Sequence, residues 1–117
     1  TLHDALAIVA ASRDPAAALL VDPLHLARSG GTAADVARVP REYLAYAQIC
    51  DATPHGPGAD DPEGILAEAL DGRLQCGEGG LPLAALLRAL PAGLPLSVEM
   101  RSRRLRDNCP DPLERAR

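Results

Sequence analysis

Three side chains that carry oxygen donors stand at similar places along the chain: Asp22, Gln48 and Glu99 each directly follow a short apolar run. Each run is typical of a β-strand, and helical stretches separate the runs. Strands that alternate with helices form parallel sheets, and the carboxyl ends of such strands carry the chemistry. Oxygen donors from neighbouring strand ends are the ligands that a hard divalent cation needs. The spacing therefore predicts a metal site at one edge of a parallel sheet.

The elements that must position these residues follow from apolar periodicity and from helix caps. Thr1, Thr32 and Asp61 are N-cap residues that directly precede predicted helices. Leucines at i, i+3, i+4 and i+7 predict that one face of the helix over 82–90 packs on a sheet. The predicted order is helix 2–12, strand 17–22, helix 33–38, strand 44–50, loop 52–62, helix 62–71, loop 77–80, helix 82–90 and strand 95–99, with a further helix beginning near Pro112.

The bulk properties limit the fold and the partners. A chain of 117 residues accommodates one domain of ordinary size, but not a complete β/α barrel of about 250 residues. The net charge of -4 gives no basic footprint, so no nucleic-acid partner is expected. No apolar run approaches the roughly 18 residues that span a bilayer, so no membrane partner is expected. Phe and Trp are absent, and the core must consist of Leu, Val, Ile and Ala.

The cysteines indicate the redox environment. Cys50, Cys76 and Cys109 form no C-x-x-C pair, and their number is odd. This pattern argues against a disulfide scaffold and for a reducing compartment. No signal peptide is visible in the sequence. A cytoplasmic location is therefore expected.

Four segments, in order and spacing, resemble the xylose isomerase-like TIM barrels, a superfamily that includes sugar (phosphate) isomerases and epimerases. Residues 21–31 resemble the motif of the sixth strand, and residues 47–51 resemble the seventh strand. Residues 73–79 are similar to the arginine-plus-glycine loop, with Cys76 where a proline is usual. Residues 96–99 resemble the eighth strand with its terminal glutamate. The resemblance implies an α/β fold, a partial (β/α)8 TIM barrel made of strands six to eight with their helices and a parallel sheet.

The resemblance also implies a domain organisation and a metal site. Residues 1–117 would be the C-terminal portion of the barrel domain, with the N-terminal strands absent. The metal of the family is held by one residue from each of four strands, and Asp22, Gln48 and Glu99 match the second, third and fourth of these positions. The first glutamate of the set would lie before Thr1.

Further residues of the resemblance concern substrate and catalysis. His25 and Arg73 match substrate-binding residues, and His25 is also a candidate catalytic residue. Glu99, a carboxylate beside the metal, is the candidate for shuttling a proton. A metal that polarises a carbonyl makes the adjacent proton easier to remove, which is the step that isomerisation of a small hydroxy-carbonyl substrate requires. The donors favour Mn²⁺ or Mg²⁺ as the divalent metal cofactor, with Co²⁺ or Zn²⁺ as alternatives.

Two other functions stay open at this point. Gln48 stands where histidine is commoner, and glutamine there resembles the 3-dehydroshikimate dehydratases of the same superfamily. The parent would then be a lyase. The absent first ligand instead favours a non-catalytic, truncated barrel fragment. Open strand edges predict pairing with the missing N-terminal half of the barrel or assembly into a homo-oligomer.

Several of these residues also have a purely structural interpretation. Gln48 can be a hydrogen-bonded amide of the core, because a buried amide needs partners. Arg73 follows a glycine that ends a helix, where a basic residue also interacts with the helix dipole. Asp51 is more often a turn cap or a partner of a metal ligand than a ligand itself. The arginines within 101–106 are expected in a solvated loop.

Overall fold

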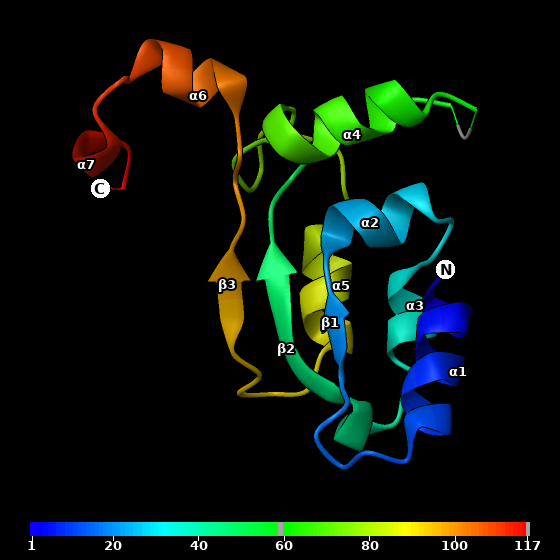
Figure 1. The fold of residues 1–117 in the computed structure, drawn as a ribbon. Coiled ribbons are helices and arrows are strands. Elements are labelled where there is room, and N and C mark those ends of the chain that lie inside the picture. The colour runs from blue at the N-terminus through cyan, green and yellow to red at the C-terminus, as the bar shows by residue number, and fades with distance from the viewer. Residues whose placement is uncertain (59, 117) are drawn as a thin grey trace.

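The centre of the molecule is a parallel sheet of three short strands. The computed structural model describes residues 1–58 and 60–116. Its strands are β1 (Leu19–Val21), β2 (Leu44–Ile49) and β3 (Leu96–Val98), in the spatial order β1-β2-β3, and both neighbouring pairs are parallel. The three arrows therefore point the same way in Figure 1, and their carboxyl ends lie at one edge of the sheet. The α/β class and the parallel sheet are confirmed.

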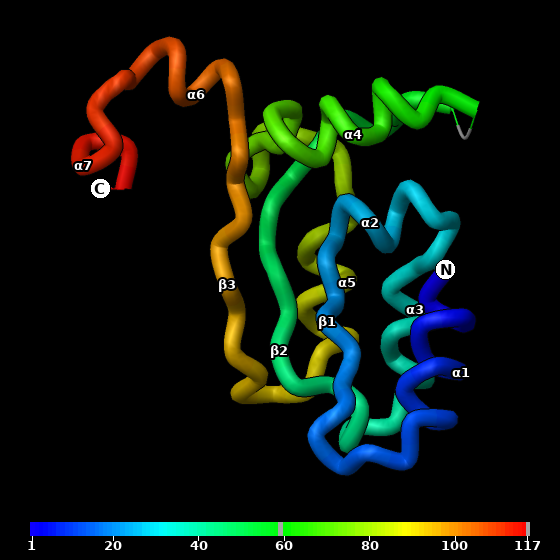
Figure 2. Tube along the Cα trace, viewed as in Figure 1, coloured from blue at the N-terminus to red at the C-terminus, as the bar shows by residue number. Residues whose placement is uncertain are grey.

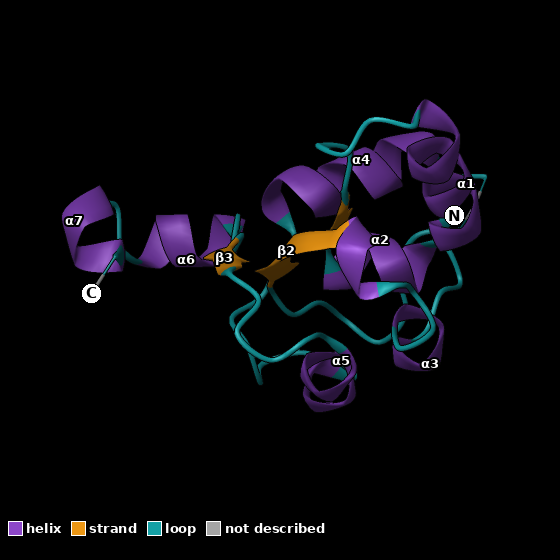
Figure 3. Ribbon diagram, turned by 90° about the horizontal axis from the view of Figure 1, so that it is seen from below, coloured by secondary structure: helices purple, strands orange, loops and turns teal. Residues whose placement is uncertain are grey.

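Helices precede, connect and follow the strands. They are α1 (Leu2–Ser12), α2 (Pro23–Arg28), α3 (Ala33–Val36), α4 (Pro62–Asp71), α5 (Leu83–Ala89), α6 (Arg103–Asn108) and α7 (Pro112–Arg115), with a 3₁₀ turn η1 (Arg41–Tyr43) before β2. Figure 3 shows α3 and α5 on the same side of the strands, and Figure 2 shows α2 and α4 just beyond the carboxyl ends of β1 and β2. Among the described residues, none of these helices has the length and apolarity needed to cross a membrane.

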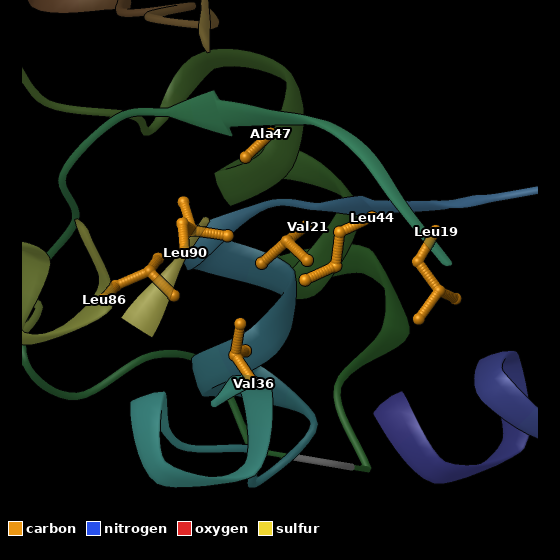
Figure 4. Packing of buried hydrophobic residues seen from close by; sticks show 7 residues of the cluster. All are labelled: Leu19, Val21, Val36, Leu44, Ala47, Leu86 and Leu90. Carbon is orange, nitrogen blue, oxygen red and sulfur yellow. The ribbon is translucent and has the colours of Figure 1, made fainter. Parts of the chain in front are cut away.

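The main core lies between the sheet and these helices. Its fully buried side chains are Leu19, Val21, Val36, Leu44, Ala47, Leu86 and Leu90 (Figure 4). The apolar face of α1, which comprises Leu2, Ala5, Leu6 and Val9, packs against this cluster. Burial of each large aliphatic side chain stabilises the fold by about 1.5–3 kcal/mol. The core thus holds one face of the sheet against the helices and leaves the other face and the carboxyl edge to the candidate site.

The helix caps expected from the sequence are present. Thr1 and Thr32 each accept the backbone N–H three residues on and form capping boxes with an aspartate. Asp61 accepts the N–H of Gly64 at 2.8 Å, directly before the N1 proline of α4. These contacts satisfy backbone donors that have no partner inside the helix. The starts of α1, α3 and α4 are therefore confirmed.

Two helices were not foreseen. Asp22-Pro23 begins α2 through the same cap-plus-proline signal as Asp61-Pro62, but only six residues follow, too few for a visible apolar period. The prediction of a solvated loop for the arginines within 101–106 is wrong for Arg103–Arg106. Ser102 accepts the N–H of Leu105 at 3.3 Å, caps α6 and places those arginines on a short helix.

The other predicted elements differ from the structure by two residues or fewer at each end. One part of the packing differs: Leu86 and Leu90 are buried as predicted, whereas Leu87 is 43% exposed. The predicted loop 52–62 includes Ala59, which lies outside the described residues. The last helix begins at Pro112 as predicted and ends at Arg115.

The sheet face opposite the core is open within the described part of the chain. Leu20 and Tyr46 pair in the register of β1 and β2, and both are exposed on that face. All three residues of β3 are exposed. β1 and β3 each have β2 as their neighbour in the sheet, so each presents an outer edge.

Candidate functional site

The strand register brings the three predicted metal ligands to one end and one face of the sheet. Gln48 pairs with Ser97, and Asp22 directly follows the β1 residue that pairs with Ala47. Asp22 and Gln48 therefore stand at the same level of neighbouring strands. Glu99 lies two residues beyond Ser97, and side chains two apart along extended backbone point to the same face.

Gln48 and Glu99 are in direct contact. The side-chain amide nitrogen of Gln48 donates to Oε2 of Glu99 at 3.4 Å, and both side chains are half-buried. The backbone N–H of Glu99 donates to the carbonyl of Ile49 at 3.1 Å, so the ladder of β2 and β3 continues to the glutamate. Two adjacent strands thus deliver an amide and a carboxylate to the same point.

Asp22 is buried at the end of β1, and both of its carboxylate oxygens have donors. Oδ1 accepts the backbone N–H of His25 at 3.0 Å, which is the N-cap bond of α2. Oδ2 accepts from Nη1 of Arg73 at 2.8 Å, and the two side chains are 2% and 4% exposed. The dominant partner of Asp22 is therefore a guanidinium 51 residues away in the sequence.

Arg73 is held from several sides. Its Nε donates to the carbonyl of Ala69 at 3.1 Å, and its Nη1 also donates to Sγ of Cys50 at 3.0 Å. Burial disfavours the charged guanidinium, but the hydrogen bond and the charge of Asp22 outweigh it and raise the pKa of Arg73. Arg73 stays protonated and joins the segments after β1, β2 and α4. Its predicted role in substrate binding stays a prediction, because its donors face protein groups.

His25 lies on the exposed side of α2, close to the buried pair. Its Nε2 is 3.4 Å from Nη2 of Arg73. Because a guanidinium can only donate, Nε2 can act only as the acceptor in this contact. A cavity of about 350 Å³ lies beside His25 and Asp22, with walls from α1 and β1. Such a volume accommodates a small molecule.

The side-chain oxygens of Gln48 and Glu99 suit a hard divalent cation. Asp22 suits it in part, because other groups already bind its two oxygens. Two oxygens bound at right angles to Mg²⁺ at about 2.1 Å lie about 3.0 Å apart, so the contacting Gln48 and Glu99 atoms, 3.4 Å apart, would need to approach by only about 0.4 Å. Half a turn of the Gln48 amide would present its oxygen there. Asp22 retains a free lone pair on each oxygen besides its two N–H donors. Within residues 1–58 and 60–116, no three His, Cys, Asp or Glu side chains gather around one point, so the amide is an essential member of the set.

Two neighbours of the site received less weight in the sequence interpretation. Cys50 was considered only for disulfides, yet its buried thiol accepts from Arg73, and burial raises the pKa of that thiol so that it stays neutral. Asp51 is buried and accepts backbone N–H groups of Ala52, Gly77 and Leu81. Its predicted role as a turn cap is confirmed. The sequence feature that could have identified Cys50 as a neighbour of the site is its position two residues after Gln48, on the same face of an extended segment.

Comparison with known proteins supports the fold. No family model and no curated protein matches the sequence. Among solved structures, the chain is similar to the IolI protein, whose crystal structure contains a bound zinc atom, with a TM-score of 0.70 and 21% identity over 87% of this chain. It is also similar to a xylose isomerase-like TIM barrel/4-hydroxyphenylpyruvate dioxygenase fusion protein, with a TM-score of 0.70 and 20% identity over 86% of this chain.

These similarities cover a minor part of each solved structure. The chain spans 35% of the IolI chain and 16% of the fusion protein. Its three parallel strands and their helices therefore have the fold of one part of a TIM barrel, as the resemblance implied.

Proposed function

We propose that this chain carries part of the active site of a divalent-metal-dependent enzyme that isomerises or epimerises a small hydroxy-carbonyl compound, such as a sugar or sugar phosphate. The observation that carries the proposal is the contact between Gln48 and Glu99, on the same sheet face and at the same end as Asp22. The fold adds support, because active sites of TIM barrels lie at the carboxyl ends of the strands. A zinc atom bound to IolI is consistent with a metal at such a site.

In this proposal the residues have distinct tasks. Gln48, Glu99 and Asp22 would hold the cation, for which Mn²⁺ or Mg²⁺ suits the oxygen donors best. When bound, the cation would polarise the substrate carbonyl and acidify the neighbouring C–H group. Glu99 would accept or return that proton. His25 would donate a hydrogen bond to a substrate oxygen through Nδ1, the ring nitrogen that is not in contact with Arg73.

A dehydration is the second candidate reaction. The observation that favours it is Gln48 itself, a neutral amide at the strand position where the resemblance makes histidine commoner. Removal of the same proton, followed by loss of a β-hydroxyl, would give an unsaturated product instead of an isomer. The two reactions share the cation, Glu99 and His25, and differ in where the electron pair goes.

Metal binding is the first test. Isothermal titration of the purified protein with MnCl₂ should show one site, and Glu99→Gln should weaken binding by more than about tenfold, because a ligand matters at least as much as its outer-shell partners do. Glu63→Gln is the matched control, since Glu63 is an exposed carboxylate in the first turn of α4. A wild-type protein that binds neither Mn²⁺ nor Mg²⁺ would refute the proposal.

Proton exchange separates the two reactions. Sugars and hydroxy-ketone acids incubated with the protein and Mn²⁺ in D₂O are followed by NMR. An isomerase or epimerase incorporates deuterium next to the carbonyl and returns an isomer, whereas a dehydratase yields an alkene signal. Protein that binds metal but catalyses neither change would favour the non-catalytic interpretation.

A further inference from the structure

Asp22 differs from the other two candidate ligands because the protein already restrains both of its oxygens. Oδ1 is bound by the N–H of His25 at 3.0 Å, and Oδ2 by the guanidinium of Arg73 at 2.8 Å. The carboxylate is buried, so water does not compete for these bonds. Its rotation is therefore fixed by the start of α2 on one side and by a permanent cation on the other.

Arg73 is itself anchored firmly enough to impose this restraint. Besides Asp22 it contacts the carbonyl of Ala69 and the sulfur of Cys50 through its side chain. Its backbone N–H donates to the carbonyl of Arg101 at 3.0 Å. Movement of the guanidinium away from Asp22 would break bonds to three separate segments. An anchored cation at Oδ2 repels any second cation that approaches that oxygen.

We infer that Arg73 is a positioning residue that limits Asp22 to a one-oxygen contact with a bound cation and thereby selects the metal against Ca²⁺; this inference rests on the proposed metal site. Ca²⁺ takes six to eight oxygens and often binds both oxygens of one carboxylate. Mg²⁺ and Mn²⁺ take fewer ligands and accept one oxygen from each carboxylate. Only Oδ1 of Asp22 is free of the guanidinium, so Asp22 cannot offer Ca²⁺ the two-oxygen contact that this ion often takes.

The test compares the dissociation constants for Ca²⁺ and Mn²⁺ by titration calorimetry. Wild-type protein should bind Ca²⁺ at least about tenfold more weakly than Mn²⁺, and Arg73→Met should reduce that ratio by roughly tenfold, the usual scale of an outer-shell partner. Arg73→Lys keeps the charge but not the planar fork, and should give an intermediate ratio. Arg28→Met is the matched control, because Arg28 forms a largely buried, two-nitrogen pair with Glu68 that does not include Asp22.

The outcomes separate the inference from the proposed function. Wild-type protein that binds no divalent cation refutes both. Metal binding with an unchanged ratio in folded Arg73→Met, or an equal change in Arg28→Met, refutes the selectivity role alone. If circular dichroism shows that neither Arg73 variant folds, the wild type decides, and equal affinity for the two ions overturns the inference.

Discussion

Asp51 closes the loop over residues 75–81 onto the end of β2. Its Oδ1 accepts the N–H groups of Ala52 at 2.9 Å and Leu81 at 3.0 Å, and its Oδ2 accepts that of Gly77 at 3.0 Å. Gly79 approaches so closely that a Cβ there would collide with Oδ1 of Asp51 and with the carbonyl of Ala52. One buried carboxylate therefore holds in place the glycine-rich loop that follows Arg73 in the chain.

The backbone donors around Asp51 make its contribution depend on pH. Burial disfavours the charged carboxylate, but the N–H groups of Leu81, Ala52 and Gly77 together outweigh it and hold the pKa of Asp51 below its usual range. A lowered folded pKa gives stability that is fully present above the unfolded value of about 3.9 and is lost as pH falls through the folded value.

We therefore expect Asp51→Asn to lower the free energy of unfolding by about 2–3 kcal/mol at neutral pH, because charge-assisted hydrogen bonds are lost in a buried place. The difference from wild type should shrink as the pH falls below about 4, where the wild-type carboxylate also loses its charge. Urea unfolding across this pH range measures both effects. Asp107→Asn, at an exposed carboxylate, should change little, and an equal loss there would contradict the argument.

At the residue scale, the sequence revealed which side chains gather but not how they pair. The order of strands predicted that Asp22, Gln48 and Glu99 share one end of the sheet, and the register agrees. The bond from Arg73 to Asp22 joins residues 51 positions apart, and no local pattern encodes such a pairing. A role as metal ligands stays a prediction for all three.

At the scale of elements, α5 shows how narrow the helix–sheet contact is. Its leucine periodicity predicted a face of four side chains, yet Leu86 is 3% exposed and Leu87 is 43% exposed. The helix has only seven residues, and its buried stripe meets β1, β2 and α3 through Leu86 and Leu90.

Leu86→Ala should therefore destabilise the protein by about 2–4 kcal/mol, since it leaves a cavity in the core as well as removing buried apolar surface. Leu87→Ala changes the same residue type one position along the same helix and should cost less than about 1 kcal/mol. Urea unfolding monitored by circular dichroism gives both values. Equal costs for the two variants would show that another surface covers Leu87 in solution.

The elements that the sequence did not predict are short ones. α2 and α6 have six residues each, so their apolar pattern contains less than two turns. Each is defined instead by a cap, Asp22 or Ser102, and the same caps also occur in turns that do not continue as helices. Longer elements with complete caps, such as α1 and α4, were predicted at their observed bounds.

At the scale of the whole molecule, the sheet has two outer edges and one face left open by the residues that the structure describes. A closed barrel has no strand edges, but three strands leave one at β1 and one at β3. Leu20 and Tyr46 are exposed on the face opposite the core, and Val98 on β3 is 63% exposed. Unpaired backbone groups beside exposed apolar side chains are a template for pairing with another strand. The alternation of elements predicted this sheet, but it did not reveal what covers the open face.

We expect the purified 117-residue chain to self-associate through these surfaces. Sedimentation equilibrium should give a mass above 12.2 kDa that rises with concentration. Val98→Lys should shift the mass toward the monomer, because a lysine on an edge strand opposes strand addition. Ile8→Lys is the control, since Ile8 is an aliphatic residue that is 71% exposed on helix α1 and does not belong to a strand. A wild-type chain would show that the open edges need no partner if it stays monomeric at every concentration and unfolds cooperatively with a free energy of unfolding of several kcal/mol.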